Sequence, residues 1–428
     1  MTRWVLPLLS MALVVAGCGS KTGLGVPPAR DAGPDGGRDA GFDGGSDAGT
    51  DAGPVPDECI DLPFEEPPEE VRVSFEGRIL AADVLFLVDT TGSMGEEIAQ
   101  IQSTLRDVLI PATVETIGDV RLSVASLADF PRASYGGDRD VPFLLVQPST
   151  SDIEAMRRAV DRLPSSSGAD GPESQTEALY LAATGEGMGV FVPPSRCPEG
   201  TVGYPCFRPD GSRIILLFTD APFHNGPGGS NAYGPDVSPT PHTYAESINA
   251  LRSIGAKVLG LFSGGSDTEA LRDLQAVARD TGAVTPTGEP IVFDIGTDGR
   301  RLDRGVVETI STLVDEVPID IDVLVEDVEG DPFDATAFVR DIVALRADPP
   351  DGAINRGDRF DRVRPGTRVT FSIQLQNDIL PPATEPRTYM MRIVLRGDGI
   401  TRLQSTLVQV LIPGIRMETC DDLRMMGL

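Results

Sequence analysis

Oxygen-bearing side chains follow an apolar run early in the chain. Residues 84–88 read Val-Leu-Phe-Leu-Val, and Asp89, Thr91 and Ser93 follow at intervals of two residues. A buried strand that ends in this way places a carboxylate and two hydroxyls on one turn, and such hard oxygen ligands suit a hard divalent cation. Ligand sites of open α/β sheets lie at this carboxyl end of the strands. The spacing therefore predicts a divalent-metal site.

Two later segments carry further acidic groups. Residues 169–173 read Ala-Asp-Gly-Pro-Glu, and residues 218–224 read Phe-Thr-Asp-Ala-Pro-Phe-His at the end of another apolar run. With the first segment, they resemble the three metal-binding loops of von Willebrand factor A domains, in the integrin β branch of that family and its bacterial relatives. The resemblance covers residues 82–315, and it implies a domain that binds protein through a metal.

Carried over residue by residue, the resemblance implies a metal shell of Asp89, Thr91, Ser93, Glu173 and Asp220. In the family, the hydroxyls usually touch the metal, the aspartates often act through water, and an acidic group of a partner completes the shell. Glu173 stands where many relatives have threonine; Thr176 is the alternative, but Glu173 keeps the family's distance to Ala178. Three carboxylates around one divalent ion would make it less electrophilic and would repel an incoming carboxylate.

Neighbouring acids could hold further metal. Glu96 and Glu97 align with the acidic pair of a second metal site in integrin β subunits, although acids in the first turn of a helix are also favoured by its dipole. Asp170 aligns with another accessory ligand, but the family's asparagine two residues earlier is Gly168 here. His224 could be a ligand or a base, or could simply pack in its loop. Hydroxyl-rich shells that retain water suit Mg²⁺, with Mn²⁺ and Ca²⁺ as alternatives.

The N-terminus predicts export. Arg3 precedes an apolar stretch at residues 4–15, which is too short to span a bilayer, and Val-Ala-Gly-Cys ends at Cys18. This pattern resembles a bacterial lipoprotein signal peptide, which implies cleavage before Cys18 and its lipidation; an ordinary secretory signal is the competing interpretation. Gly19 favours the outer membrane by analogy with enteric bacteria. Lipid would then be the anchor of the chain.

A tether and two disulfides are expected next. In residues 18–57 an aspartate recurs every four residues among Gly and Ala, a composition that cannot bury a core and predicts disorder. The four remaining cysteines favour two disulfides in an oxidising compartment. Cys197 and Cys206 flank one loop, and Cys59 and Cys420 lie at the two ends of the folded region, so we pair them in this way.

The periodicity predicts two folded domains. Strand-like runs at residues 84–88, 121–126, 143–146, 213–218, 257–262 and 291–294 alternate with helical stretches, so residues 81–316 are expected to form a doubly wound, mostly parallel α/β sheet. Two of the helices should begin at the capping boxes that start at Ser151 and Ser266. Alternation with period two predicts a β-sandwich over residues 317–416, followed by a tail at 417–428. Within residues 58–80, Val71, Val73 and Phe75 alternate similarly, and we hypothesise that this segment pairs with the sandwich.

Charge and motifs narrow the function. A net charge of −29 excludes nucleic-acid binding through a basic face. We expect a cell-surface adhesion or protein-interaction module whose metal bridges to an Asp or Glu of a partner protein, and we do not expect an enzyme. A structural envelope protein with a fold-stabilising metal is the alternative. A metal-dependent hydrolase is disfavoured, because the sequence has no activated nucleophile, His-rich ligand set or Gly-rich phosphate loop.

Overall fold

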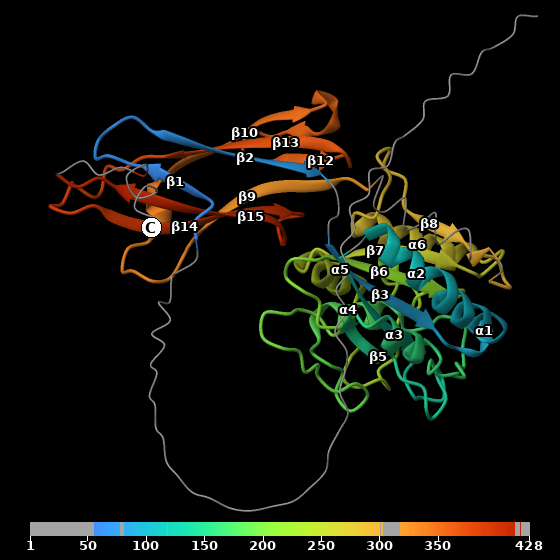
Figure 1. Ribbon diagram of the computed structural model, residues 1–428. Helices are drawn as coiled ribbons and strands as arrows, with labels where there is room; N and C mark the ends of the chain where they lie inside the picture. Colours follow the sequence, from blue (N-terminus) through green and yellow to red (C-terminus); the bar gives the residue numbers. More distant parts are fainter. Residues whose placement is uncertain are drawn as a thin grey trace, which may run out of the picture. The chain divides into compact units, whose positions relative to one another are not determined.

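The computed structural model describes residues 55–77, 81–117, 119–299, 301–302, 317–415 and 420. These residues form an α/β domain and a β-sandwich, which confirms the predicted fold class (Figure 1). The signal peptide, Cys18 and the aspartate-rich segment up to residue 54 lie outside the described residues, as do the side chains of Glu96 and Glu97. Within the described part, no helix is both long and apolar enough to cross a membrane.

The sheet of the α/β domain has the strand order β5-β4-β3-β6-β7-β8, and only β5 is antiparallel to its neighbour. The central strands β3 and β6 are buried along almost their whole length, as expected for strands covered on both faces. Every strand predicted for this domain is present. Their bounds are β3 (Ala81–Asp89), β4 (Asp119–Leu127), β5 (Leu144–Thr150), β6 (Ser212–Thr219), β7 (Lys257–Phe262) and β8 (Val292–Asp294).

Helices cover both faces of this sheet (Figure 1). One face packs against α1 (Gly95–Thr104), a π-helical segment (Leu105–Leu109), α2 (Ile110–Ile117) and α3 (Ile153–Val160). The other face packs against α4 (Gln175–Thr184), α5 (Tyr244–Ser253) and α6 (Thr268–Asp280). The two apolar clusters are separated by the sheet, so the domain is doubly wound as predicted.

The helix caps differ from the predicted ones by one residue. Asp152 caps α3 by accepting from the Ala155 N–H, and Asp267 caps α6 by accepting from two backbone N–H groups. The predicted caps at Ser151 and Ser266 are therefore wrong, because the carboxylate one residue later makes the capping hydrogen bonds. A complete capping box occurs instead at α5, between Thr243 and Glu246.

The sandwich consists of a six-stranded sheet, β1-β15-β14-β9-β12-β11, and a three-stranded sheet, β10-β13-β2. β2 pairs along its whole length with β13, from Glu69 opposite Leu375 to Gly77 opposite Thr367. The α/β domain is thus inserted between strands of one sandwich. The bounds are β1 (Glu58–Asp61), β2 (Glu69–Gly77), β9 (Ile319–Asp327), β10 (Val339–Asp348), β11 (Ile354–Asn355), β12 (Phe360–Val363), β13 (Thr367–Leu375), β14 (Arg387–Gly397) and β15 (Thr401–Ile412).

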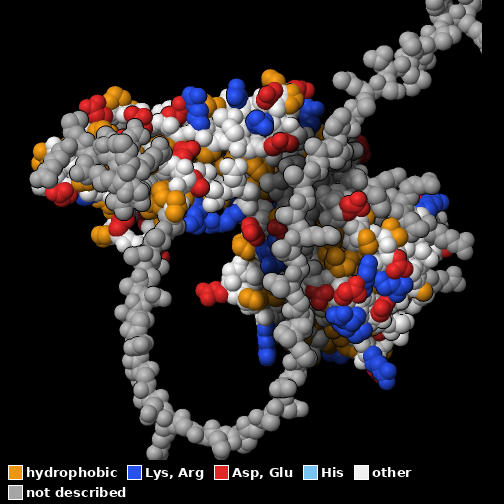
Figure 2. Space-filling model, in the orientation of Figure 1, with side chains coloured by type: hydrophobic (Ala, Val, Ile, Leu, Met, Phe, Trp, Pro, Cys, Tyr) orange, Lys and Arg blue, Asp and Glu red, His pale blue; other side chains and the backbone are white. Residues whose placement is uncertain are grey.

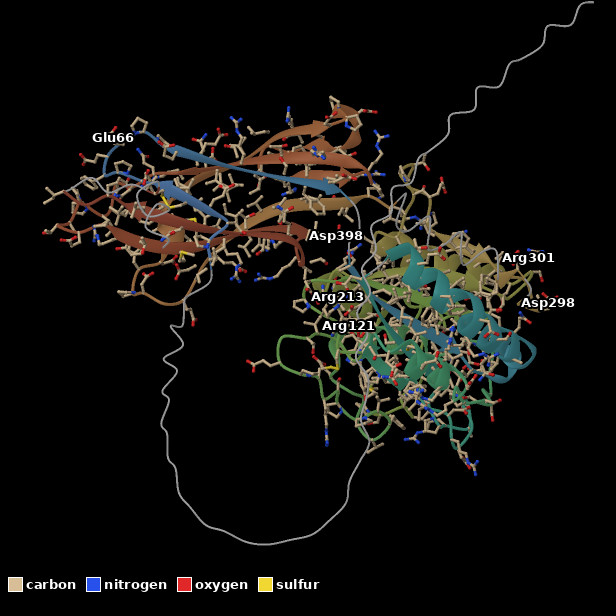
Figure 3. All side chains as sticks on the ribbon, in the orientation of Figure 1. Glu66, Arg121, Arg213, Asp298, Arg301 and Asp398 are labelled. Carbon is tan, nitrogen blue, oxygen red and sulfur yellow. A yellow bond between two sulfur atoms is a disulfide. The ribbon has the colours of Figure 1, made fainter. Side chains whose placement is uncertain are left out.

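Both disulfides join the predicted pairs, Cys59 with Cys420 and Cys197 with Cys206 (yellow in Figure 3). Cys59 lies on β1, which adds a parallel strand to β15, so the first crosslink holds the N-terminal edge of the sandwich to the end of the chain. On the face shown in Figure 2, acidic and basic side chains are interspersed.

Candidate metal site

Asp89 forms the buried centre of the site. It is the last residue of β3 and is fully buried. Its Oδ1 accepts from the Thr91 backbone N–H at 3.0 Å and from the Thr91 hydroxyl at 2.7 Å, and its Oδ2 accepts from the Thr219 hydroxyl at 2.7 Å. The carboxylate is therefore fixed in orientation by the turn that follows it and by the neighbouring strand.

The ends of β3 and β6 bring the next two predicted residues together. The two strands are parallel neighbours, with Val88 opposite Phe218, so the residues that follow them meet at one edge. There the Ser93 hydroxyl donates to Asp220 Oδ1 at 2.9 Å, and the Ser93 and Thr91 hydroxyl oxygens are 3.4 Å apart.

Glu173 reaches the site because the second and third loops pair with each other. The Glu173 N–H donates to the Pro222 carbonyl at 2.9 Å, and the His224 N–H donates to the Glu173 carbonyl at 2.8 Å. The Glu173 side chain is buried, and its Oε2 has no hydrogen-bond partner. The alternative ligand, Thr176, lies in α4 and donates to the Asn225 carbonyl instead.

Burial and mutual repulsion make the three acidic side chains of the site harder to ionise in the metal-free protein. Burial, and secondarily Asp220, raises the pKa of Asp89 to about 6, whereas burial together with Asp89 and two further acids raises the pKa of Glu173 to about 11. Burial also raises the pKa of Asp220. Among the described residues, no Lys or Arg forms an ion pair with these three carboxylates. Buried, unpaired carboxylates and hydroxyls are the donor set that a hard divalent cation requires, so these residues fit such an ion.

A second acidic cluster adjoins the first. Asp129, Asp170 and His224 offer ligand atoms that lie within 4.8 Å of one another. Asp129 is fully buried, its Oδ2 has no hydrogen-bond partner, and burial raises its pKa to about 8. The two acids of this cluster also raise the pKa of Glu173, so the two clusters are electrostatically continuous.

The hydrogen bonds of His224 determine which of its two ring nitrogens carries a proton and which one faces the acids. Its Nδ1 lies 2.6 Å from the Asn231 carbonyl, which can only accept, so Nδ1 carries the proton. Its Nε2 then faces Asp170 Oδ2 at 3.2 Å and Asp129 Oδ2 at 3.4 Å. Nε2 therefore presents a lone pair to two acidic side chains, and a cation could bind between these three groups.

Sequence analysis did not identify Thr219, Gln175 or Asp129 as residues of the site. Thr219 orients Asp89 and in turn accepts from Gln175 Nε2 at 2.8 Å, while Asp129 comes two residues after the end of β4. The signal for Asp129 is the one that identified Asp89 and Asp220, an acid next to the carboxyl end of an apolar strand. The signal for Thr219 is its place directly before Asp220.

No protein-family model matches this sequence, and no curated protein matches it significantly. One similar solved structure is a von Willebrand factor type A protein from Catenulispora acidiphila, with 12% identity, 86% of this chain and 76% of that chain covered, and a TM-score of 0.34. Another is the pilus adhesin SpaC from Lactobacillus rhamnosus GG in its open conformation, with 11% identity, coverages of 82% and 45%, and a TM-score of 0.33. The chain spans less than half of that adhesin. TM-scores this low establish no shared fold or function, so functional conclusions rest on the residues of the site.

Proposed function

We propose that this chain is a divalent-metal-dependent protein-binding module of the adhesion type. Its metal would be held by Asp89, Thr91, Ser93, Glu173 and Asp220, with Mg²⁺ as the expected ion and Mn²⁺ or Ca²⁺ as alternatives. The observation that carries this proposal is the buried Glu173 carboxylate, whose Oε2 has no partner and whose neighbours are other acids. A bound divalent ion would supply the missing positive charge.

The proposed metal ligands differ in their exposure to solvent, so a partner could reach the site from one side. Asp89 and Thr91 are buried, whereas Ser93 is exposed and Asp220 is half-buried. A partner would therefore approach over Ser93 and Asp220, where a carboxylate could complete the metal shell. Glu173 adds a third negative charge, which would weaken the attraction of such a carboxylate and favour partners that contribute further contacts.

Metal binding is tested first with the metal alone. Titration calorimetry of the full chain with MnCl₂ or MgCl₂ should show saturable binding that Asp89→Ala abolishes. Asp358→Ala, which removes an exposed acid of the sandwich, should bind like the wild type. Equal binding by wild type and Asp89→Ala would reject the site.

Partner binding is tested next. The immobilised chain should capture a protein from a cell-envelope extract in MgCl₂ and release it in EDTA, and the Asp89→Ala variant should capture none of it. The alternative, a structural envelope protein with a fold-stabilising metal, is favoured by the complete burial of Asp89. It predicts that metal raises Tm while the same capture occurs in MgCl₂ and in EDTA.

We also propose an accessory cation at Asp170, Asp129 and His224, where the lone pair of Nε2 faces two carboxylates. Metal analysis of the dialysed chain should then give two ions per chain, and His224→Ala should lower this to one. One ion in both proteins would assign a proton to this position. The predicted pair Glu96 and Glu97 would have to be tested separately, by the Glu96→Gln and Glu97→Gln variants in the same analysis.

We propose a binding role and not a catalytic one. Within the described residues, both histidines are engaged by acids, His224 by Asp129 and Asp170, and His242 by Glu177 at 3.0 Å. Neither is hydrogen-bonded to a serine or cysteine that it could activate. Metal-dependent hydrolysis of ester or phosphoester substrates that Asp89→Ala removes would contradict this proposal.

We place the module at the cell envelope, attached through lipid on Cys18 and directed to the outer membrane. The lipoprotein-like sequence that ends at Cys18 supports this placement, and two disulfides fit an oxidising compartment. Metabolic labelling with an alkyne fatty acid should mark the wild type and not Cys18→Ser. Absence of label in the wild type would indicate an ordinary secretory signal.

A further inference from the structure

Asp140 is a buried carboxylate that, within the described residues, accepts hydrogen bonds only from backbone N–H groups. Its side chain is 3% exposed. Its Oδ2 accepts from the N–H groups of Gly137 at 2.8 Å and Gly168 at 2.9 Å, and its Oδ1 accepts from the Ser167 N–H at 3.1 Å. Among the described residues it forms no ion pair, so these three charge-assisted hydrogen bonds balance its charge.

The segment that Asp140 holds is in direct contact with the first metal loop. The Ser166 N–H donates to the Thr90 carbonyl at 2.8 Å, and the Gly92 N–H donates to the Ser167 carbonyl at 3.1 Å. The Ser166 and Thr90 hydroxyls are also 3.1 Å apart. Residues 166–168 therefore connect Asp140 to the turn that carries Thr91 and Ser93.

Gly168 also fits closely against two of the metal-site residues. A Cβ added at Gly168 would lie 2.8 Å from Glu173 Oε1 and 3.4 Å from the Thr91 Cβ, and the residue has a φ of +64°. The backbone of Gly168 thus packs closely beside the Glu173 carboxylate. Any shift of residues 166–168 would change the space that is available to this carboxylate.

We propose that Asp140 is a positioning residue of the metal site, which fixes residues 166–168 and through them the Glu173 carboxylate and the Thr91 hydroxyl. This inference rests on the proposed function. Within the described residues, Asp140 forms no hydrogen bond with the side chains of the proposed ligands, and it acts by holding the backbone. Groups of this kind, which orient metal ligands from behind, typically change metal affinity by about 10- to 100-fold when they are mutated.

The test compares two variants that disturb residues 166–168 on different sides, one facing Asp140 and the other facing Glu173. Asp140→Asn replaces one acceptor oxygen by an NH₂ group, which cannot accept from Gly137 and Gly168. Gly168→Ala adds a methyl group beside Glu173 at a left-handed backbone position. Calorimetry with MnCl₂ should show affinities at least tenfold weaker for each variant. The double variant should be weaker by less than the product of the two single effects, since both act through one segment.

Two further measurements separate positioning from a general loss of stability. In EDTA, Asp140→Asn should accelerate amide hydrogen exchange at Ser167 and Gly168 while the strands β3 and β6 keep their protection. Asp152→Ala, which removes another carboxylate that accepts a backbone N–H, should lower Tm without changing the affinity for Mn²⁺.

The outcomes distinguish the inference from the proposed function. If the wild type binds Mn²⁺ and both variants bind it with wild-type affinity, the inference is overturned and the proposed function stands. If the wild type binds no metal, the proposed function itself fails. Should Asp140→Asn not fold, Gly168→Ala decides alone, because unchanged affinity in that variant also overturns the inference.

Discussion

The acids of the site couple metal binding to protons. In the metal-free protein, Glu173 has a pKa of about 11 and Asp89 one of about 6, so at pH 7.5 Glu173 is protonated and Asp89 is charged. A cation that takes the Glu173 carboxylate must displace its proton. Near pH 7.5, the ion that binds Glu173 should therefore displace about one proton from this side chain. Calorimetry in buffers of different ionisation enthalpy measures this number.

The matched variant for this prediction is Glu173→Gln, which keeps the shape of the side chain and removes the titration. Near pH 7.5 this variant should release about one proton fewer per chain than the wild type. Proton release that is the same in both proteins would assign the coupling to another group, such as Asp129, whose pKa is about 8.

Asp89 also gives the metal-free fold a pH dependence. Its pKa is raised by burial from the usual 3.8 to about 6, so the folded state binds a proton more tightly than the unfolded state. The resulting stability is complete below pH 3.8 and is lost as the pH rises through 6. In EDTA, Tm should thus fall between pH 4 and pH 7, and saturating Mg²⁺ should reduce the fall. A Tm that rises over this range would contradict the assignment.

Thr219 should matter as much as a ligand, although it was not predicted. Thr219→Val keeps the shape but removes the hydrogen bond to Asp89 Oδ2, and it leaves Gln175 Nε2 without its closest acceptor. The variant should lose about 1–2 kcal/mol of unfolding free energy and about tenfold in metal affinity. Urea denaturation and calorimetry measure the two effects. Thr388→Val, on an exposed face of β14, should change neither.

At the residue scale, residues in short motifs could be predicted from the sequence, whereas residues whose role depends on contacts between distant loops could not. The five proposed ligands could be named because they occur in short segments with a familiar spacing. Asp140 could not, because its role arises from loops that meet only after β3, β4 and β6 are side by side. A single sequence does not indicate which backbone N–H a buried carboxylate will accept from.

At the scale of elements, α6 anchors the third metal loop. Asp273 on α6 is 5% exposed, and its Oδ2 accepts from the Phe223 N–H at 2.9 Å. Asp273→Ala would leave that N–H buried without its partner, so it should cost about 1–3 kcal/mol of unfolding free energy. Urea denaturation checks this value. Arg279→Ala, on the exposed side of the same helix, serves as the control, and an equal loss in both variants would refute the anchoring role.

Helices and strands could be predicted where burial of one face or of both faces gives a regular pattern of apolar residues in the sequence. The central strands β3, β6 and β7 of the α/β domain contain near-continuous apolar runs, and apolar and polar residues alternate in β9 and β13. β10 is harder to predict, because register shifts after Val339 and after Ala344 interrupt its period of two. The caps lie one residue later than predicted because Ser and Asp adjoin at both positions and the Asp carboxylate makes the capping hydrogen bonds.

At the scale of the whole molecule, the crosslink between Cys59 and Cys420 closes a loop that contains both domains, with a sequence separation of 361. Cys59→Ser with Cys420→Ser should cost about 2–5 kcal/mol of sandwich stability. Because both cysteines lie outside the α/β domain, affinity for Mn²⁺ should stay unchanged. Thermal unfolding followed by calorimetry, with Cys197→Ser and Cys206→Ser as the comparison pair, checks both statements. A large loss of metal affinity would show that the crosslink also supports the metal site.

The insertion of the α/β domain has a mechanical consequence. The chain enters that domain after β2 and leaves it before β9, and these two strands belong to different sheets of the sandwich. A tensile load applied by a partner at the metal site would thus be divided between two covalent connections. Neither sheet would carry the whole force, and the load would reach the N-terminal side of the chain through β1, next to a covalent crosslink.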